Sequence, residues 1–574
     1  MIPELNFEIR EKDIGARIGR LEINCKRIET PTIMPVINPL KEIISIEELH
    51  KDFNVEILMT NAYILLKNEN LRETVLKKGI HKFLGFDGVI ATDSGSFQLM
   101  QYGNVLTTNK EIIDFQERIG SDIGSFLDIP SLPDTYKARA EEQLELTLKR
   151  AEEAKYAKFV VNAGIQGSTY LDLRKKAARK IGKDFQLCAV GGIVGIMEDY
   201  RFSDLVDIIA TVKKNIPLDR VVHAFGLGHP VVFSLAIALG CDLFDSAAYA
   251  LYANELRYMT ETGTKKLNEL KYIPCNCPVC SKYDLELKEL EKNELIKELA
   301  RHNLYVTFEE LKRIKEAIYE GNLWNLLSIR MRSHPNLLSG LERLLKYNKY
   351  LAEIDKITNK SAFYYLGRES KHRTEIINVK RRLKRVSSNN LLNIPPFGFV
   401  PLELTEIYPF ISTITPESKK RDDIPHSIPD IKKVRAMMEY QFGRGAGELI
   451  SDNAIIKKSR KTGRMRWIYE DNELIASIRA SDNWILPKEK LAKRLHKRFP
   501  YPMLRVVIDE EAVPFIMDGK SVFCKFVLDI DKNLRCMDEV LIVDVNDNLI
   551  RTGTLYLSPR EIVNFRYGVA VRVR

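Results

Sequence analysis

Short apolar runs alternate with amphipathic stretches along the first half of the chain. Between about residues 20 and 260, each run is followed by a break rich in Gly, Asp or Ser and then by a segment with helical spacing. The runs lie at 55–59, 89–91, 125–127, 159–161, 187–190, 221–225 and 241–244. Alternating strands and helices are typical of a parallel sheet, and seven or eight consecutive units favour a closed barrel over an open sheet. The pattern therefore predicts an α/β fold, a TIM-type (β/α)8 barrel.

Polar and small residues follow these runs rather than precede them. They lie at 92–98, 128, 162–167, 191–192, 226–229 and 245–246. In a parallel barrel the carboxyl ends of all strands open on one face, so residues far apart in the sequence converge around one pocket. The sequence therefore predicts a functional site at that face.

The chain changes character after about residue 284. Charged helices are expected at 285–299 and 308–319, and the strand–helix alternation is lost near 345–365. Short strands separated by turns end the chain and predict a compact β-barrel of about 75 residues. These strands are expected at 504–508, 521–528, 539–543, 549–557 and 569–573. Four domains are expected: the barrel with a cysteine-rich insertion (1–345), a linker or small domain (346–428), a second small α+β domain (429–499) and the terminal β-barrel (500–574).

The excess positive charge lies in the C-terminal part. The formal net charge is +10, yet residues 1–350 hold 48 basic and 49 acidic residues, which leaves 40 basic and 29 acidic residues for 351–574. Basic clusters lie at 380–385, 457–466 and 493–498. Because phosphate neutralisation supplies most sequence-independent affinity for nucleic acids, this distribution indicates a polyanionic partner. The alternative is that the lysines only keep the surface soluble.

Composition and cysteine usage restrict the class of protein. Apolar residues make up 45% and charged residues 29%, and no stretch approaches the roughly 20 apolar residues of a membrane span. Three of the eight cysteines crowd into one segment, while the others are scattered, mostly within apolar runs. This usage fits a reducing compartment and one metal site better than a disulfide framework. We therefore expect a soluble globular protein of the cytoplasm.

The clustered cysteines are Cys275, Cys277 and Cys280, and His302 follows in a charged helical stretch. Three closely spaced thiolates can wrap one tetrahedral ion with the histidine as fourth ligand, which predicts a Cys3His site for Zn²⁺. All four positions would be filled by protein, so the ion is expected to be structural rather than catalytic. The alternatives are three buried or redox-active cysteines, and a histidine that is only a surface or core residue.

Asp93 and Asp245 each follow a predicted strand. Asp93 stands beside small residues that allow a ligand to approach closely, and Phe97 offers a ring on which a base can stack. Two carboxylates across a barrel mouth provide the nucleophile and the acid/base of glycosidic chemistry. Each aspartate could instead cap a helix, which is an ordinary role for this residue type.

Segment 93–98 resembles the Asp-Ser-Gly-Gly/Ser-Phe-Gln motif of the tRNA-guanine transglycosylases. The segments around Gln166, 191–192 and Asp245, together with the Cys-x-Cys-x-x-Cys…His motif, are similar to that family in content and order over about the first 340 residues.

Other segments resemble the archaeal branch of this family, which acts in archaeosine synthesis. They are Ser96, residues 223–230 and 243–252, and the long C-terminal extension. The last unit resembles a PUA domain, an RNA-binding β-barrel found in several RNA-modifying enzymes.

The resemblance implies exchange of guanine at position 15 of the tRNA D-arm for the free base 7-cyano-7-deazaguanine (preQ0). It places Asp245 where the family keeps its covalent nucleophile and Asp93 where it keeps a general acid/base, although the sequence alone leaves the two roles interchangeable. An ionised carboxylate at Asp128 can accept the N1 and N2 hydrogens of a guanine-type base. The residues that match substrate-binding positions are Asp93, Ser94, Phe97, Asp128, Gln166, Gly192 and Ile193.

The implied mechanism needs no nucleotide cofactor. Asp245 attacks the ribose anomeric carbon as guanine leaves, and preQ0 loses a proton to Asp93 as it displaces the carboxylate, so that two inversions give retention. The expected partners are tRNA and preQ0, without a membrane, and a homodimer is left open.

Two rival classes remain at this point. One is a tRNA-binding paralogue that acts later in archaeosine synthesis without base exchange, and the presence of the aspartates and all four zinc positions counts against it. The other is a metabolic barrel enzyme acting on a small molecule, which the basic C-terminal part disfavours.

Overall fold

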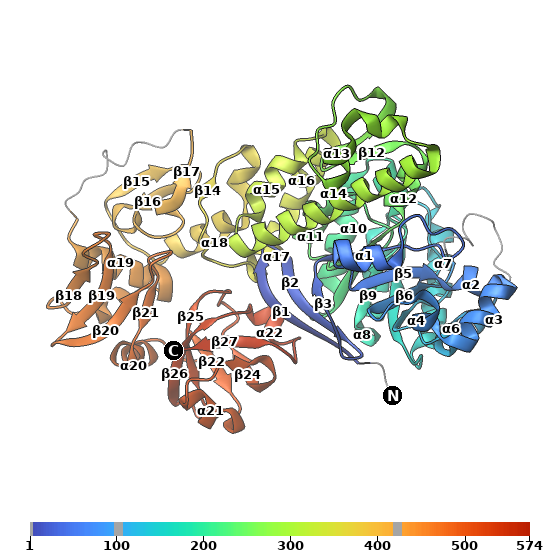
Figure 1. Cartoon of the computed structure of the whole chain (residues 1–574). Coiled ribbons are helices and arrows are strands. Elements are labelled where there is room, and N and C mark those ends of the chain that lie inside the picture. Colours follow the sequence, from blue (N-terminus) through green and yellow to red (C-terminus); the bar gives the residue numbers. More distant parts are fainter. Residues whose placement is uncertain (1–3, 97–106, 417–427) are drawn as a thin grey trace. The chain divides into compact units, whose positions relative to one another are not determined.

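Two compact units make up the part of the chain that the computed structural model describes, which is residues 4–96, 107–416 and 428–574 (Figure 1). The first unit comprises Met1–Glu11, Ala16–Ile318 and Ile329–Leu344. The second comprises Lys12–Gly15, Tyr319–Ser328 and Leu345–Arg574.

Eight parallel strands form the main sheet of the first unit, in the order β4-β11-β10-β9-β8-β7-β6-β5. A bridge between Val36 and Met59, with a hydrogen bond of 2.8 Å from the N–H of Ile37 to the carbonyl of Met59, joins the two edge strands. The sheet therefore closes into the predicted (β/α)8 barrel. The strands are β4 (Thr32–Pro35), β5 (Ile57–Asn61), β6 (Val89–Asp93), β7 (Ile123–Gly124), β8 (Val160–Ile165), β9 (Leu187–Val190), β10 (Val221–Ala224) and β11 (Leu243–Ser246).

Helices connect the barrel strands, as the alternating pattern predicts. In α6, Thr108 and Glu111 form a capping box at the start, and Gly120 ends the helix with a φ of 77°. Its buried residues recur at helical spacing and face the core. The helices are α1 (Ile46–Phe53), α2 (Ala62–Lys67), α3 (Glu69–Lys78), α4 (Ile80–Leu84), α6 (Asn109–Ile119), α7 (Lys137–Ala154), α8 (Leu171–Asp184), α9 (Val194–Glu198), α10 (Phe202–Asn215), α11 (Pro230–Ala238) and α12 (Ala248–Asn254).

Two barrel strands depart from the predicted runs. The run at 125–127 lies beyond β7, because the Gln116 side chain binds the backbone of Ser125, accepting from its N–H at 3.0 Å and donating to its carbonyl at 2.8 Å. β4 is absent from the predicted runs because Pro31 precedes it and Pro35 is its last residue, and proline is rare within sheets.

Smaller elements complete the first unit and lead into the second. β1 (Leu5–Asp13), β2 (Ala16–Ile23) and β3 (Lys26–Thr30) form an antiparallel sheet. The two predicted helices at 285–299 and 308–319 belong largely to one helix, α14 (Lys292–Glu320), since no Gly or Pro interrupts it. The remaining elements are β12 (Arg257–Thr260), β13 (Gly263–Lys266), α13 (Pro278–Tyr283), α15 (Leu323–Met331) and α16 (Pro335–Leu344).

The second unit contains the predicted small α+β elements followed by the C-terminal β-domain. The latter has a six-stranded sheet in the order β23-β27-β26-β25-β22-β24. The predicted strand at 521–528 is wrong as one strand, because the 3-10 turn Cys524–Phe526 divides it into β23 and β24. In the described residues, no helix has both the length and the apolar character needed to cross a bilayer.

The elements of the second unit fall into three consecutive groups. The first group is α17 (Asn348–Ile354), β14 (Phe363–Tyr364), α18 (Thr374–Leu383), β15 (Leu391–Ile394), β16 (Gly398–Pro401) and β17 (Thr413–Ile414). The second is α19 (Asp430–Phe442), β18 (Ile455–Lys458), β19 (Met465–Glu470), β20 (Glu473–Ile478), β21 (Ile485–Pro487) and α20 (Glu489–Arg498). The third is β22 (Arg505–Ile508), α21 (Val513–Met517), β23 (Val522–Phe523), β24 (Val527–Ile530), β25 (Glu539–Val543), β26 (Leu549–Leu555), α22 (Pro559–Ile562) and β27 (Val569–Val573).

Candidate active site

The sequence-predicted site residues lie at the carboxyl ends of the barrel strands. Asp93 is the last residue of β6, and Asp245 is the third residue of β11. Gln166 directly follows β8, and Gly192 lies two residues beyond β9. Because all eight strands run parallel, these ends meet at one mouth of the barrel.

Asp93 is a carboxylate held in a partly buried and acidic environment. Burial, followed by the negative charges of Asp128 and Asp245, raises its pKa to about 7. The Asn61 Nδ2 donates to its Oδ2 at 3.2 Å, from the neighbouring end of β5. A carboxyl group with this pKa can both give and take a proton near neutral pH.

Ser94 has a side chain that supports the loop after β6. Its hydroxyl donates to the carbonyl of Phe126 at 2.9 Å and lies 3.0 Å from the Ser96 hydroxyl. The residue is fully buried. Its backbone N–H, with that of Gly95, opposes the raised pKa of Asp93, the predicted acid/base. Phe97, the predicted stacking residue, lies outside the described residues.

Asp128 and Gln166 form a buried pair beside Asp93. The Gln166 Nε2 donates to Asp128 Oδ2 at 2.6 Å, while the Gln166 Oε1 has no partner among the described residues. Burial raises the pKa of Asp128, and hydrogen bonds from Gln166 and Ser96 oppose this shift. A Cβ at Gly191 would lie 2.1 Å from Gln166 Nε2, and one at Gly164 would lie 2.4 Å from Asp128 Oδ2. A side chain at either position would therefore displace the Gln166–Asp128 pair.

Arg174 supports the two loops that carry Gln166 and Gly192. Its buried guanidinium donates to the carbonyls of Ile165, Ser168 and Gly191 at 2.6 to 2.8 Å. Burial lowers its pKa to about 9. The helical spacing of α8 predicts only a charged residue here, and no pattern in the sequence indicates that this arginine points inward.

Asp245 has two donors on one of its oxygens. His223 Nε2 lies 2.8 Å from Oδ1, and the N–H of Gly226 donates to the same oxygen at 2.5 Å. On the other side of the imidazole, the Asn162 amide lies 3.0 Å from His223 Nδ1. His223 and Asn162 are both buried and are not among the residues predicted from the sequence. A histidine and an asparagine inside otherwise apolar strands are the pattern that could have identified them.

Helix capping does not explain Asp245. The helix that follows, α12, has Ala247 as its N-cap residue and no side-chain hydrogen bond at the cap. The Ser246 hydroxyl, rather than Asp245, accepts from the N–H of Ala248 at 2.9 Å. The Asp245 carboxylate therefore does not cap α12.

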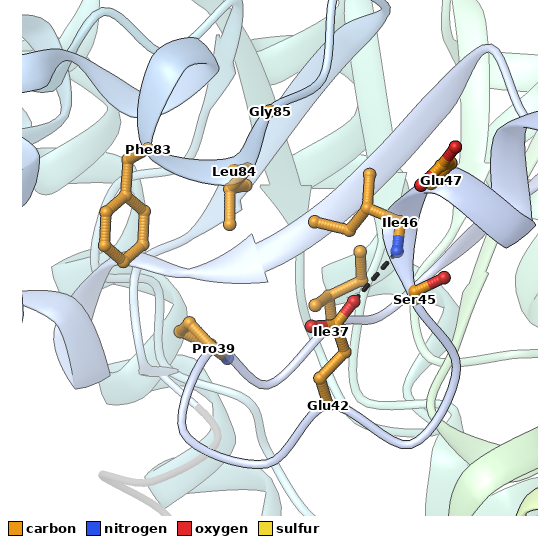
Figure 2. Close-up of a pocket in the computed structure, with 9 residues that line it drawn as sticks. All are labelled: Ile37, Pro39, Glu42, Ser45, Ile46, Glu47, Phe83, Leu84 and Gly85. Atoms are coloured by element: carbon orange, nitrogen blue, oxygen red, sulfur yellow. Dashed lines mark hydrogen bonds between the residues drawn. The ribbon is translucent and has the colours of Figure 1, made fainter.

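A cavity of about 300 Å³ lies elsewhere in the first unit and is lined by none of the predicted site residues (Figure 2). It contains Glu42 and Glu47, and the Glu42 side chain accepts from the N–H of Ile46 at 2.9 Å. This cavity is separate from the carboxylate site, because neither Asp93 nor Asp245 lines it.

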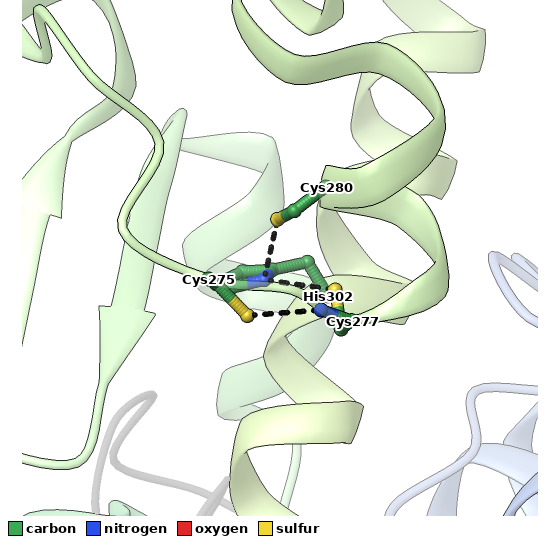
Figure 3. A group of neighbouring side chains, drawn as sticks. All are labelled: Cys275, Cys277, Cys280 and His302. Atoms are coloured by element: carbon green, nitrogen blue, oxygen red, sulfur yellow. Dashed lines mark hydrogen bonds between the residues drawn. The ribbon is translucent and has the colours of Figure 1, made fainter.

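The four predicted metal ligands converge in one cluster. Cys275, Cys277, Cys280 and His302 point toward one another, and their donor atoms all lie within 4.8 Å of one another (Figure 3). Three thiols and one imidazole at this spacing fit the requirements of a tetrahedral ion. This cluster can therefore hold a metal ion.

The surroundings of His302 fix which ring nitrogen faces the cluster. Its Nε2 lies 2.9 Å from the carbonyl of Met259, to which it donates, so Nδ1 is left for a metal. The Tyr258 ring stacks on the imidazole at 3.8 Å, and its hydroxyl lies 3.4 Å from Cys280 Sγ. Neighbouring Asn303 binds the N–H of Met259 at 3.0 Å. The hairpin of β12 and β13 is thus attached to α14 beside the cluster.

The basic clusters of the C-terminal part are not all available to a partner. Arg382 is buried and pairs with Asp538 at 2.7 Å. Arg385 donates to the carbonyl of Gln441 at 3.0 Å. By contrast, Arg460, Lys461 and Arg464 are exposed between β18 and β19.

These features define a class of protein: a (β/α)8-barrel enzyme with a carboxylate site at its mouth, a Cys3His cluster that can hold a metal ion, and C-terminal accessory domains. Comparison with known proteins narrows this class. Residues 12–336 match the family model described as queuine tRNA-ribosyltransferase. Residues 432–502 match the patch-forming domain C2 of tRNA-guanine transglycosylase, and residues 504–574 match the PUA domain.

Relatives align over nearly the whole chain. A tRNA-guanine(15) transglycosylase of Thermococcus onnurineus is 48% identical to this chain. The alignment covers 100% of this chain and 99% of the relative. The protein of that name from Pyrococcus furiosus is 48% identical with 99% and 98% covered, and that from Methanocaldococcus jannaschii is 44% identical with 99% of both covered. The chain belongs to the tRNA-guanine transglycosylase family, a family of pentosyltransferases.

Proposed function

We propose that this chain replaces guanine at position 15 of tRNA with preQ0, as a step of archaeosine biosynthesis. The observation that carries the proposal is the pair Asp93 and Asp245 at one barrel mouth, in a chain whose relatives are named for this exchange. Asp128 and Gln166 beside them offer the acceptor and amide groups that a guanine-type base requires.

In the proposed mechanism Asp245 is the nucleophile. Its attack on the ribose C1′ breaks the bond to guanine, and Asp93 gives its proton to the departing base. Incoming preQ0 transfers its N9 proton to the Asp93 carboxylate, and N9 then attacks C1′ and releases Asp245. Two inversions retain the configuration, and Asp93 returns to its starting protonation state. A pKa of about 7 for Asp93 supports both transfers.

We further propose that the Cys3His cluster holds one structural Zn²⁺. Its four protein ligands would leave no position for substrate, so the ion supplies folding stability rather than chemistry. Replacing Cys277 with Ala is expected to remove the metal and to lower the melting temperature by at least about 5 °C, while kcat of the folded fraction stays unchanged. Metal analysis and thermal melting check this, with exposed Cys25→Ala as the control. Full stability without metal would contradict the assignment.

The exposed basic loop between β18 and β19 is a candidate site for binding the tRNA backbone. Changing Arg460, Lys461 and Arg464 to Glu is expected to weaken tRNA binding and to reduce the slope of log Kd against log salt by about 0.7–0.9 for each phosphate that the loop neutralises. The control changes Lys77 and Lys78, exposed on α3, to Glu. Equal salt slopes in all three proteins would rule this site out. Deleting residues 501–574 would be a poorer test of tRNA binding than these substitutions. The deletion would remove Asp538 and leave the buried Arg382 without its ion-pair partner.

Domain boundaries, compartment and oligomeric state are also proposals. We propose four domains, at 1–345, 346–428, 429–499 and 500–574, which the family matches support. The gathering of Cys275, Cys277 and Cys280 in one metal-ligand cluster, rather than in a disulfide framework, supports a reducing, cytoplasmic compartment. A homodimer stays a prediction.

Release of labelled guanine tests the proposed function. Purified protein is incubated with guanine-labelled tRNA, with and without preQ0. Without preQ0 we expect release of at most one equivalent of guanine for each enzyme, and with preQ0 we expect release of one equivalent for each tRNA. Tight tRNA binding without any release would instead indicate the paralogue that acts after base exchange.

A further inference from the structure

His223 contacts the proposed nucleophile, Asp245. It is the third residue of β10, is fully buried, and lies with its Nε2 2.8 Å from Asp245 Oδ1. Its Nδ1 lies 3.0 Å from the Nδ2 and 3.3 Å from the Oδ1 of Asn162. A carboxylate oxygen only accepts, so the ring nitrogen that faces it, Nε2, carries a proton, and Nδ1 faces the Asn162 amide. The ring therefore donates to the Asp245 carboxylate.

The donors on Asp245 are distributed unevenly. His223 and the N–H of Gly226 both bond Oδ1, and in the described part of the chain no donor bonds Oδ2. Donors that hold one oxygen fix the plane of a carboxylate and leave the other oxygen with its lone pairs available. Oδ2 is thus the oxygen that can attack.

We propose that Asn162 and His223 are positioning residues that hold Asp245 with Oδ2 toward the ribose C1′. This inference rests on the proposed function. In this arrangement the Asn162 amide binds Nδ1 of His223 and keeps the ring proton on Nε2. The Nε2–H of His223 and the N–H of Gly226 then both donate to Asp245 Oδ1. The three residues come from β8, β10 and the loop after β10, which the barrel brings to one level of its interior.

Two substitutions at His223 separate this role from simple packing. His223→Leu removes the donor and retains an apolar side chain of similar reach, whereas His223→Gln retains an amide N–H. We expect His223→Leu to lower kcat and the single-turnover rate of tRNA adduct formation by about 10- to 100-fold, with KM for tRNA within about twofold of wild type. His223→Gln is expected to recover most of the lost rate.

The same barrel provides a matched control. His81 Nε2 lies 3.0 Å from Asp122 Oδ2, beside the amino end of β7, so this pair resembles His223 and Asp245 but lies away from the mouth. His81→Leu is expected to lower the melting temperature and to leave kcat unchanged.

The outcomes distinguish this inference from the function on which it rests. If wild type releases no guanine, the proposed function fails and the positioning role falls with it. If wild type exchanges guanine while His223→Leu retains its kcat, only the positioning role is wrong. The same holds if His223→Leu and His223→Gln lose equal activity in proportion to their lost stability. Should His223→Leu not fold, His223→Met, which also lacks the donor, takes its place. A reduced kcat at unchanged KM in His223→Met supports the role, and a wild-type kcat overturns it.

Discussion

Asp245→Asn is expected to abolish base exchange, with a loss of at least about 10³-fold in kcat, and to eliminate any tRNA adduct that survives denaturing electrophoresis. The amide keeps the shape of the carboxylate and its contact with Gly226 but cannot form the ester to ribose. Binding of tRNA should remain, because phosphate contacts supply most of the affinity. A denaturing gel and a binding titration measure the two effects.

Asp122→Asn is the matched control for this change. Asp122 is also a buried carboxylate that binds a histidine, His81, and one backbone N–H, that of Ile90. We expect Asp122→Asn to lose stability and retain the adduct. An adduct retained by Asp245→Asn would show that another residue is the nucleophile.

Asp93→Asn is expected to give the second large effect, a loss of about 10²- to 10⁴-fold in exchange. Its amide cannot give a proton to the departing guanine or accept one from preQ0. Unlike Asp245→Asn, this variant is expected to trap some covalent tRNA when the guanine finds a proton elsewhere. An adduct absent in Asp93→Asn and present in Asp245→Asn would reverse the two roles.

The pH dependence of the two half-reactions follows from the pKa of Asp93, which is about 7 in the folded protein. Adduct formation needs the protonated acid, so its rate should fall as the pH rises through about 7. Displacement of the adduct by preQ0 needs the carboxylate, so its rate should fall as the pH drops below about 7. Single-turnover rates across the pH range measure both limbs, and Asp93→Asn should flatten them.

The sequence predicts the barrel well because its strands are short apolar runs that end in polar residues. Where it fails, side chains from other elements decide the structure. The run at 125–127 leaves the sheet because Gln116, on α6, binds the backbone of Ser125. Helix periodicity also cannot reveal that Arg174 turns inward to bind three loop carbonyls.

The candidate site is likewise predictable from the sequence only in part. The two carboxylates and the cysteines are recognisable because short motifs surround them. The link from Asn162 through His223 to Asp245 joins residues 61 and 22 positions apart, on strands that meet only in the closed barrel. Counting charges also does not show which basic residues are exposed. Arg382 belongs to a basic cluster of the sequence, yet it is buried and pairs with Asp538.

The mass of the nucleotide at position 15 tests the proposed exchange most directly. A tRNA treated with the protein and preQ0 is digested, and the fragment that contains position 15 is analysed by mass spectrometry. We predict a fragment heavier by two carbon atoms, because the N7 of guanine is replaced by a carbon that bears a nitrile, with every other guanine unchanged. An unmodified fragment at position 15, or the same mass increase at other guanines, would contradict exchange at this position.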